Sequence, residues 1–117
     1  MKKMRVVLSP EAEEVYSHLN KEAKKSKIDE KLLRGINKKV ELIKYNPHYG
    51  EPISKKKIPK EYVEKYGVTN LFWVELPNFW RMIYTLTNGE TIIEIIAFVI
   101  DIIDHPTYNK VFGYKKK

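Results

Sequence analysis

The stretch TNLFWVELPNFWRMIYTLTNGETIIEIIAFVIDIID, residues 69–104, decides the fold. It contains three runs rich in β-branched and aromatic residues, which favour strands, and turn residues separate these runs at Pro77-Asn78 and Asn88-Gly89. Asn-Gly between two such runs predicts a tight hairpin, because both central residues of a type I′ turn need positive φ. The sequence therefore predicts a three-stranded antiparallel meander.

The predicted hairpin assigns its side chains to the two faces of the sheet. A two-residue Asn-Gly turn pairs Arg81 with Ile96 and Ile83 with Glu94, and paired residues share a face. The face of Arg81 is then predicted to hold Phe79, Arg81, Ile83, Glu94, Ile96 and Phe98. The other face is predicted to hold Trp80, Met82, Tyr84, Leu86, Ile93, Ile95 and Ala97. Because this second set is almost wholly apolar, we expect helices to cover it and Arg81 to lie on the opposite, more open face.

Arg81 differs from most basic residues of the chain. There are 22 Lys and Arg residues, but only Arg5, Arg34 and Arg81 are arginines. Where lysine is the usual cation, an arginine in the middle of a strand indicates a need for the forked guanidinium group. A structural alternative is an ion pair with Glu94, its diagonal neighbour across the predicted hairpin. The sequence leaves both interpretations open.

Composition limits the class of protein. A chain of 117 residues with 43% hydrophobic residues is expected to form one domain with a hydrophobic core. The absence of cysteine fits a reducing cytoplasm, and we expect neither a signal peptide nor a membrane span, since the apolar runs are too short. The net charge of +7 favours polyanionic partners, such as nucleic acid, an acidic protein or an acidic membrane surface.

The N-terminal part predicts a strand followed by two helices. Residues 5–8 are predicted to form a short first strand, and Ser9-Pro10 then supplies an N-cap and a proline at the first helical position. Asp29 is predicted to cap a second helix that ends at Asn46-Pro47. The short connection between the two helices predicts an antiparallel helical hairpin.

Two further segments complete the chain. Residues 48–68 form a basic connector, with one short helical turn predicted at 59–66, and a tail that mixes aromatic and basic residues begins at His105. The predicted element order is therefore β-α-α-β-β-β. This order predicts an α+β fold in which the helical hairpin packs on one face of a twisted antiparallel sheet.

The element order and three short motifs resemble the RelE/ParE toxin superfamily. The motifs are Trp80-Arg81-Met82-Ile83-Tyr84 on the middle strand of the meander, Asn46-Pro47 after the second helix, and His105 after the last strand. The resemblance covers residues 1–117 as a single toxin domain. It implies the toxin of a type II toxin-antitoxin system, located in the cytoplasm and partnered by a small acidic antitoxin, with assembly through that antitoxin or through copies of itself.

In the ribonuclease branch, the resemblance implies a metal-independent endoribonuclease without a cofactor that cleaves mRNA on the ribosome. A ribose 2′-OH then attacks its own 3′-phosphate, which requires a base, a cation and an acid. The matching residues are Glu51 as base, Arg81 as cation and His105 as acid, since Glu51-Pro52-Ile53 resembles a Glu-Pro-Leu-Lys loop of some members. Simpler roles stay open, because Glu51 and His105 are also typical turn residues. The three histidines do not have metal-ligand spacing, so we expect no metal site.

The remaining site residues are basic or aromatic and are predicted to contact RNA. They are Lys55, Lys56, Lys57, Lys60, Tyr108, Tyr114 and Lys115. Lysines bind phosphates without reading sequence, and aromatic rings stack on bases. A solvated loop and a frayed tail are the alternatives for these residues.

One departure from the family favours a second hypothesis. The best-known ribonuclease members carry two lysines on the strand before the arginine strand, where this chain has Phe72 and Val74. A two-residue Pro77-Asn78 turn places both on the face of Arg81. The alternative is therefore a non-catalytic RelE/ParE-like toxin, or a nucleic-acid- or topoisomerase-binding protein that has lost the ribonuclease site.

Overall fold

The computed structural model of the chain describes residues 3–88 and 94–113. Within them, five strands form one sheet in the order β1-β5-β4-β3-β2. The strands are β1 (Lys3–Leu8), β2 (Glu51–Pro52), β3 (Phe72–Leu76), β4 (Trp80–Asn88) and β5 (Glu94–Asp104). The helices are α1 (Pro10–Glu22), α2 (Lys27–Tyr45), α3 (Lys60–Tyr66) and α4 (His105–Val111), with short 3-10 turns η1 (Lys55–Lys57) and η2 (Pro77–Phe79). The α+β class is therefore confirmed.

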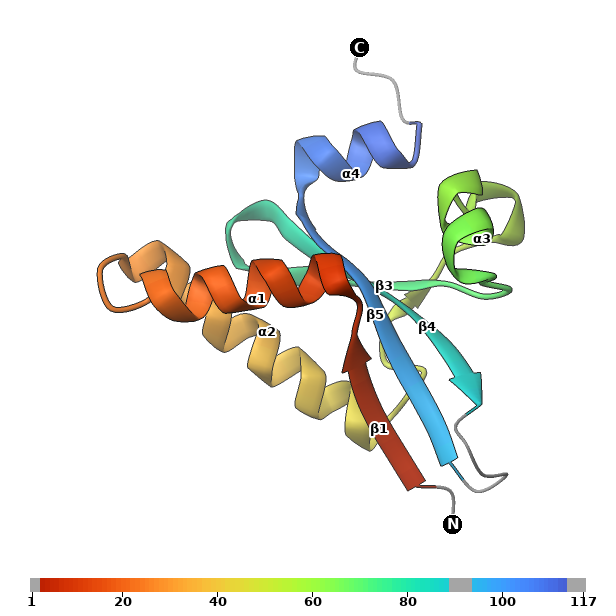
Figure 1. The fold of residues 1–117 in the computed structure, drawn as a ribbon, viewed down its shortest axis with the longest axis horizontal. Helices are drawn as coiled ribbons and strands as arrows, with labels where there is room; N and C mark the ends of the chain where they lie inside the picture. The colour runs from red at the N-terminus through yellow and green to blue at the C-terminus, as the bar shows by residue number, and fades with distance from the viewer. Residues whose placement is uncertain (1–2, 89–93, 114–117) are drawn as a thin grey trace.

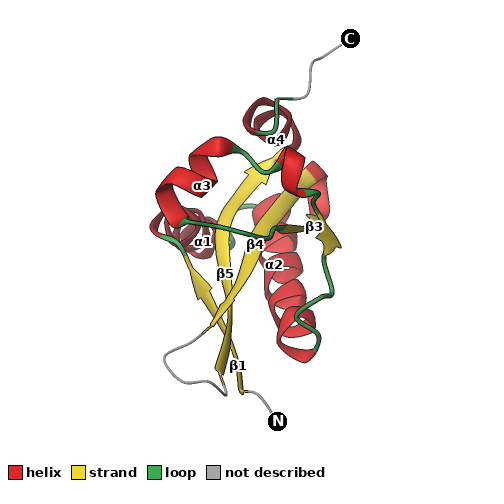
Figure 2. Cartoon of the chain, turned by 90° about the vertical axis from the view of Figure 1, so that its right-hand side faces the viewer, coloured by secondary structure: helices red, strands yellow, loops and turns green. Residues whose placement is uncertain are grey.

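Helices lie on both sides of the sheet. The hairpin of α1 and α2 covers one face, whereas α3 and α4 lie over the other (Figures 1 and 2). Strands β2 to β5 pair antiparallel, but β1 pairs parallel with β5, so the predicted antiparallel arrangement holds for β2 to β5 and not for β1. The reason is the topology: the helical hairpin carries the chain away from β1, and the meander returns so that its last strand runs beside β1 in the same direction.

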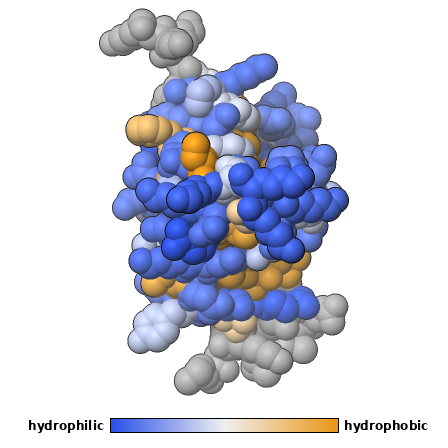
Figure 3. Space-filling model, turned by 90° about the vertical axis from the view of Figure 1, so that its left-hand side faces the viewer, coloured by the Kyte–Doolittle hydropathy of each residue, from blue (hydrophilic) through white to orange (hydrophobic). Residues whose placement is uncertain are grey.

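The helical hairpin shows how local sequence sets the helix ends. Ser9 caps α1, as predicted, and its side chain accepts a hydrogen bond of 3.0 Å from the backbone of Ala12. The cap of α2 is Ser26 and not Asp29, whose backbone N–H donates to the Ser26 hydroxyl. Seen from the side of the hairpin, the surface is mostly hydrophilic with a hydrophobic band across its lower part (Figure 3). Each helix therefore turns its polar face to water.

The predicted face of the middle strand is confirmed. The core beneath α1 and α2 contains the apolar residues Trp80, Met82, Tyr84, Leu86 and Ala97. Arg81 lies on the opposite face, but that face is less open than predicted. Tyr62 of α3 and Tyr108 of α4 pack there against Ile83 and Ile100, in a second core cluster.

The register of the β4–β5 hairpin differs from the prediction. Arg81 pairs with Ile103, Ile83 with Asp101, and Asn88 with Ile95. The predicted pairing is wrong because Asn88, the predicted first turn residue, still belongs to β4 and pairs with Ile95. Gly89 and Ile93 lie outside the described residues. Position 94 is at the far end of the hairpin from Arg81, so this register does not support the alternative ion pair between Arg81 and Glu94.

The turn between β3 and β4 contains one residue more than predicted. It spans Pro77–Phe79, and both Asn78 and Phe79 have positive φ, 61° and 62°. Phe72 therefore pairs with Tyr84, and Val74 with Met82, on the helix-covered face. The prediction that Phe72 and Val74 share the face of Arg81 is wrong, because one additional turn residue exchanges the two faces of a strand.

A bulge in β5 joins the sheet to the start of α1. The pairing shifts between Ile83 and Tyr84, which leaves Ile100 without a partner on β4. The Ser9 hydroxyl donates a 2.6 Å hydrogen bond to the Ile100 carbonyl, and the Ser9 backbone N–H donates to Val99 at 2.8 Å. Ser9 is fully buried. Its hydrogen bonds satisfy backbone groups both at the bulge and at the N-terminus of α1.

We expect Ser9→Ala to lower the free energy of unfolding by about 1–2 kcal/mol, because it removes an N-cap and leaves the Ile100 carbonyl unsatisfied. Urea denaturation of the purified protein measures this change. Ser17→Ala, at an exposed position of α1, is the matched control and should leave the unfolding midpoint nearly unchanged. Equal midpoints for Ser9→Ala and the unmodified protein would contradict this role.

None of the helices in the described ranges combines the length and the apolar character that crossing a membrane requires.

Candidate functional site

Arg81 contacts two aromatic rings on its face of the sheet. Its guanidinium carbon lies 4.0 Å from the ring centre of Trp73 and 4.4 Å from that of Tyr108. Tyr108 in turn stacks on Phe112, with ring centres 4.2 Å apart and planes 17° apart. We call Arg81, Trp73, Tyr108 and Phe112 the Arg81 cluster. Cation–π contacts of this kind strengthen where water is excluded, so the rings hold the guanidinium in place.

The guanidinium of this cluster has neither an ion-pair partner nor a hydrogen-bond partner for its Nε atom among the described residues. The Nε atom of Arg81 is buried and has no hydrogen-bond partner among the described residues. The ion pairs found in residues 3–88 and 94–113 do not include Arg81. Guanidinium remains charged at all physiological pH values and carries five N–H donors. A guanidinium that aromatic rings hold in place, without an ion pair among the described residues, is suited to bind an oxyanion through two of its oxygens.

The sheet brings Glu51 next to this cluster. Strand β2 pairs Glu51 with Trp73, and Trp73 pairs with Ile83 on β4. Since directly paired residues share a face, Glu51 lies on the face of Arg81 with Trp73 beside it. Its side chain is exposed and therefore accessible to a ligand.

Helix α4 brings His105 to the same face. His105 is its first residue, and the imidazole ring lies 6.3 Å from the ring centre of Tyr108. The structure thus gathers Glu51, Arg81 and His105 around the two rings that contact the guanidinium. No hydrogen bond joins these three described residues to one another.

The sequence predicts a tail after His105, whereas the structure has helix α4 there. The signal is present in the sequence: Asp104 is an N-cap whose carboxylate accepts a 3.0 Å hydrogen bond from the backbone of Thr107, and Pro106 follows in the first turn. Hydrogen bonding from Thr107 lowers the pKa of the Asp104 carboxyl. The helix is what places Tyr108 against Arg81.

Tyr84 connects two of the motifs that carry the family resemblance. Its hydroxyl donates to the Pro47 carbonyl at 2.8 Å and accepts from the Gly50 backbone at 2.9 Å. Tyr84 is fully buried, and this burial raises the pKa of its hydroxyl. Arg81 and Tyr84 therefore point to opposite faces: one lies in the candidate site, and the other holds the loop that delivers Glu51.

The predicted RNA-binding residues differ in their surroundings. Lys55, Lys56 and Lys57 form the exposed turn η1, and Lys60 makes only an exposed ion pair of 3.9 Å with Glu64. Tyr108 is only 3% exposed, so its ring supports Arg81 and offers no free face to a base. Tyr114 and Lys115 lie outside the described residues. Sequence reasoning missed Trp73 and Glu75, because the predicted turn placed them on the other face.

Three side chains of helix α3 donate hydrogen bonds to two carboxylates elsewhere in the described structure. The Tyr62 hydroxyl donates to Asp101 at 2.6 Å, and burial raises the pKa of that carboxyl. Glu11 of α1 receives hydrogen bonds from Lys65 and Tyr66, which lower the pKa of its carboxyl from 4.5 to about 2, with Lys65 as the larger cause. These contacts hold α3 over the sheet face that carries Arg81.

The contact of Glu11 predicts a specific pH dependence. Because folding lowers the pKa of Glu11 from 4.5 to about 2, its stabilising contribution is fully present above pH 4.5 and is lost as the pH falls toward 2. We expect Glu11→Gln to melt below the unmodified protein at pH 6 and the difference to shrink between pH 4.5 and 2. Melting curves at several pH values measure this, with Glu13→Gln on the same helix as control. A difference that stays constant with pH would assign it to other groups.

In residues 3–88 and 94–113, no group of three or more His, Cys, Asp or Glu side chains is arranged to hold a metal ion. Comparison of the chain with family models, with curated proteins and with solved structures found no match.

Proposed function

We propose that this protein is a RelE-like toxin of a type II toxin-antitoxin system and a metal-independent endoribonuclease that cleaves ribosome-bound mRNA. The observation that carries the proposal is the Arg81 cluster, in which two rings hold a guanidinium whose buried Nε has no partner among the described residues. A preorganised cation of this kind stabilises negative charge as it develops on a phosphorane.

Each step of the cleavage has a candidate group on this face. Glu51 accepts the proton of the ribose 2′-OH, whose oxygen attacks the adjacent phosphorus. Arg81 holds two phosphate oxygens while the pentacoordinate phosphorane forms. His105, in its protonated form, donates a proton to the departing 5′-oxygen, and the P–O bond to that oxygen breaks. The products are a 2′,3′-cyclic phosphate and a free 5′-hydroxyl.

A non-catalytic RNA-binding toxin is the second candidate. The observation that favours it is the contribution of β3, which supplies Trp73 and the carboxylate of Glu75 to the face of Arg81, and no cation. Glu75 pairs directly with Arg81 on β4. A site with less positive charge stabilises a phosphorane less than one that adds lysines.

The test is incubation of the purified protein with translating ribosomes and a defined mRNA, followed by primer extension. We expect cleavage that requires the ribosome and leaves a cyclic phosphate. Cleavage should also persist in EDTA, with enough magnesium added to keep the ribosomes intact. Co-expression of the product of an adjacent gene encoding a small acidic protein should suppress toxicity. Binding to ribosomes without any cleavage would support the second candidate.

The lysines of η1 predict a salt dependence. Replacing Lys55, Lys56 and Lys57 with glutamine should weaken RNA binding and flatten the plot of log affinity against log salt, by about 0.7 unit for each lost contact to single-stranded RNA. Filter binding at several salt concentrations measures the slope. The matched control replaces Lys24, Lys25 and Lys27 with glutamine. These three lysines are exposed and lie at the connection between α1 and α2. If both triple variants change the slope equally, η1 has no special role.

A further inference from the structure

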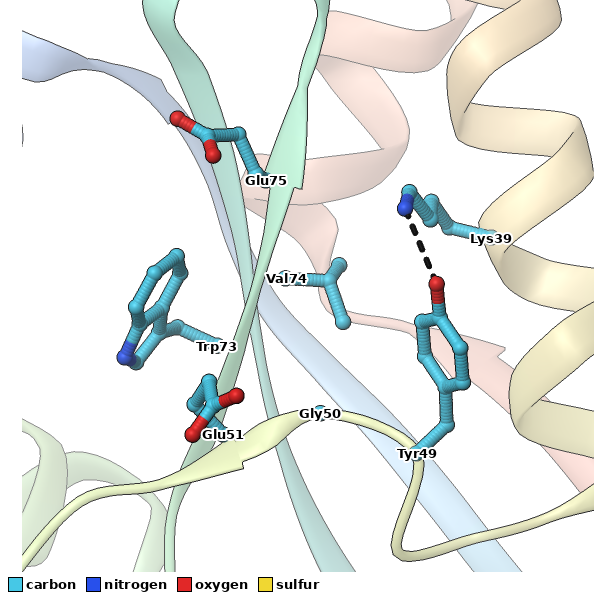
Figure 4. Close-up of a pocket in the computed structure, with 7 residues that line it drawn as sticks. All are labelled: Lys39, Tyr49, Gly50, Glu51, Trp73, Val74 and Glu75. Atoms are coloured by element: carbon cyan, nitrogen blue, oxygen red, sulfur yellow. Dashed lines mark hydrogen bonds between the residues drawn. The ribbon is translucent and has the colours of Figure 1, made fainter.

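A groove wraps around the outer edge of β3, beside the Arg81 cluster. It encloses about 360 Å³ and is lined by Lys39, Tyr49, Gly50, Glu51, Trp73, Val74 and Glu75. Figure 4 shows Trp73, Glu51 and Glu75 on one side of β3, and Lys39, Tyr49 and Val74 on the other. Strand β2 pairs only with Phe72 and Trp73 and so leaves the rest of this edge uncovered by β2. The volume lies in the range of small-ligand sites.

Tyr49 and Lys39 form one wall of the groove and contact each other. The Lys39 ammonium donates to the Tyr49 hydroxyl at 3.1 Å and lies 5.2 Å from the centre of its ring (Figure 4). Gly50 sets the floor: a Cβ there would lie 2.9 Å from the Trp73 carbonyl oxygen and from the Tyr84 ring. Because Tyr84 also binds the Gly50 backbone, the groove is anchored to the core.

Trp73 belongs both to the groove and to the Arg81 cluster. A nucleotide next to a phosphate bound by Arg81 is therefore within reach of the groove. We propose that the groove binds the base of that nucleotide and selects guanine in single-stranded RNA, with Glu75 as the selecting residue. This inference rests on the proposed function, since it places the base beside the phosphate that Arg81 holds.

The selection follows from hydrogen-bond chemistry. An ionised carboxylate only accepts hydrogen bonds, through two oxygens. Guanine presents two adjacent donors on its Watson–Crick edge, N1–H and the N2 amino group, which match that carboxylate. The corresponding edges of adenine, cytosine and uracil place acceptors next to their donors. Bases of single-stranded RNA expose this edge and stack on aromatic side chains, for which Trp73, on the same side of β3 as Glu75 (Figure 4), is available.

The experiment measures binding without cleavage, by calorimetric titration of the full-length protein. The ligands are guanosine and two single-stranded trinucleotides, UGU and UAU, with 2′-O-methyl groups that block cleavage. We expect UGU to bind about tenfold more tightly than UAU. Glu75→Gln should remove this preference by weakening UGU and leaving UAU unchanged. Arg81→Ala should weaken both trinucleotides equally and leave guanosine, which has no phosphate, unaffected.

The controls separate this inference from the proposed function. Glu41→Gln, an exposed carboxylate on α2, should retain the preference for UGU. Equal binding of UGU and UAU, or a preference that persists in Glu75→Gln, would overturn the guanine site even if the protein cleaves mRNA. Guanosine binding as tight as UGU would overturn the assignment to RNA. A preference for UGU that depends on Glu75 supports the site even if no cleavage is detected.

Discussion

Replacing Arg81 with alanine is expected to lower ribosome-dependent mRNA cleavage by about 10²-fold or more, which corresponds to about 3 kcal/mol of transition-state stabilisation. The guanidinium is the fixed cation of the site, and its contacts to Trp73 and Tyr108 keep it aligned before the phosphate arrives. Arg81→Lys keeps the charge but loses the two-point grip on phosphate, so its rate should lie between those of alanine and arginine. Single-turnover cleavage on programmed ribosomes measures all three rates.

The matched control is Arg34→Ala, which deletes the same side chain from an exposed position of α2. Arg34 makes only an exposed ion pair of 3.8 Å with Glu30, and such pairs contribute little. Its cleavage rate should equal that of the unmodified protein. Melting temperatures verify that Arg81→Ala is folded at the assay temperature. Full cleavage by a folded Arg81→Ala protein would remove Arg81 from the mechanism.

The second large effect is expected for Tyr84→Phe, which removes one hydroxyl from the core. Its loss leaves the Pro47 carbonyl and the buried Gly50 N–H without their hydrogen bonds to Tyr84, at a cost of about 3 kcal/mol in the free energy of unfolding. Because the freed loop carries Glu51 to Trp73, we also expect slower cleavage under conditions in which the variant is fully folded. Denaturant titration and the cleavage assay measure the two effects separately.

Tyr45→Phe is the control for Tyr84→Phe, since Tyr45 is 91% exposed and loses the same hydroxyl. It should change neither stability nor cleavage. If Tyr84→Phe unfolds at the same denaturant concentration as the unmodified protein, the hydrogen bonds to Pro47 and Gly50 do not hold the loop. If only stability falls, the loop does not position Glu51.

Much of the fold was predictable because it depends on local patterns. The alternation along β4 places Trp80 and Met82 toward the helices and Arg81 on the other side, whatever strand lies next to it. Ser9 and Pro10 likewise define the start of α1 through contacts within one helical turn. These predictions hold even though the predicted register was wrong.

The neighbours of Arg81 were decided only by the tertiary structure. Turn lengths set the register, and one extra residue in Pro77–Phe79 brings Trp73 and Glu75 beside Arg81 in place of Phe72 and Val74. The position of α4 follows in the same way from packing of Tyr108 on a remote strand. The sequence by itself determined which face carries the cation, because side-chain alternation is local. The tertiary structure decided what surrounds it, because register and helix docking depend on contacts between residues far apart in the chain.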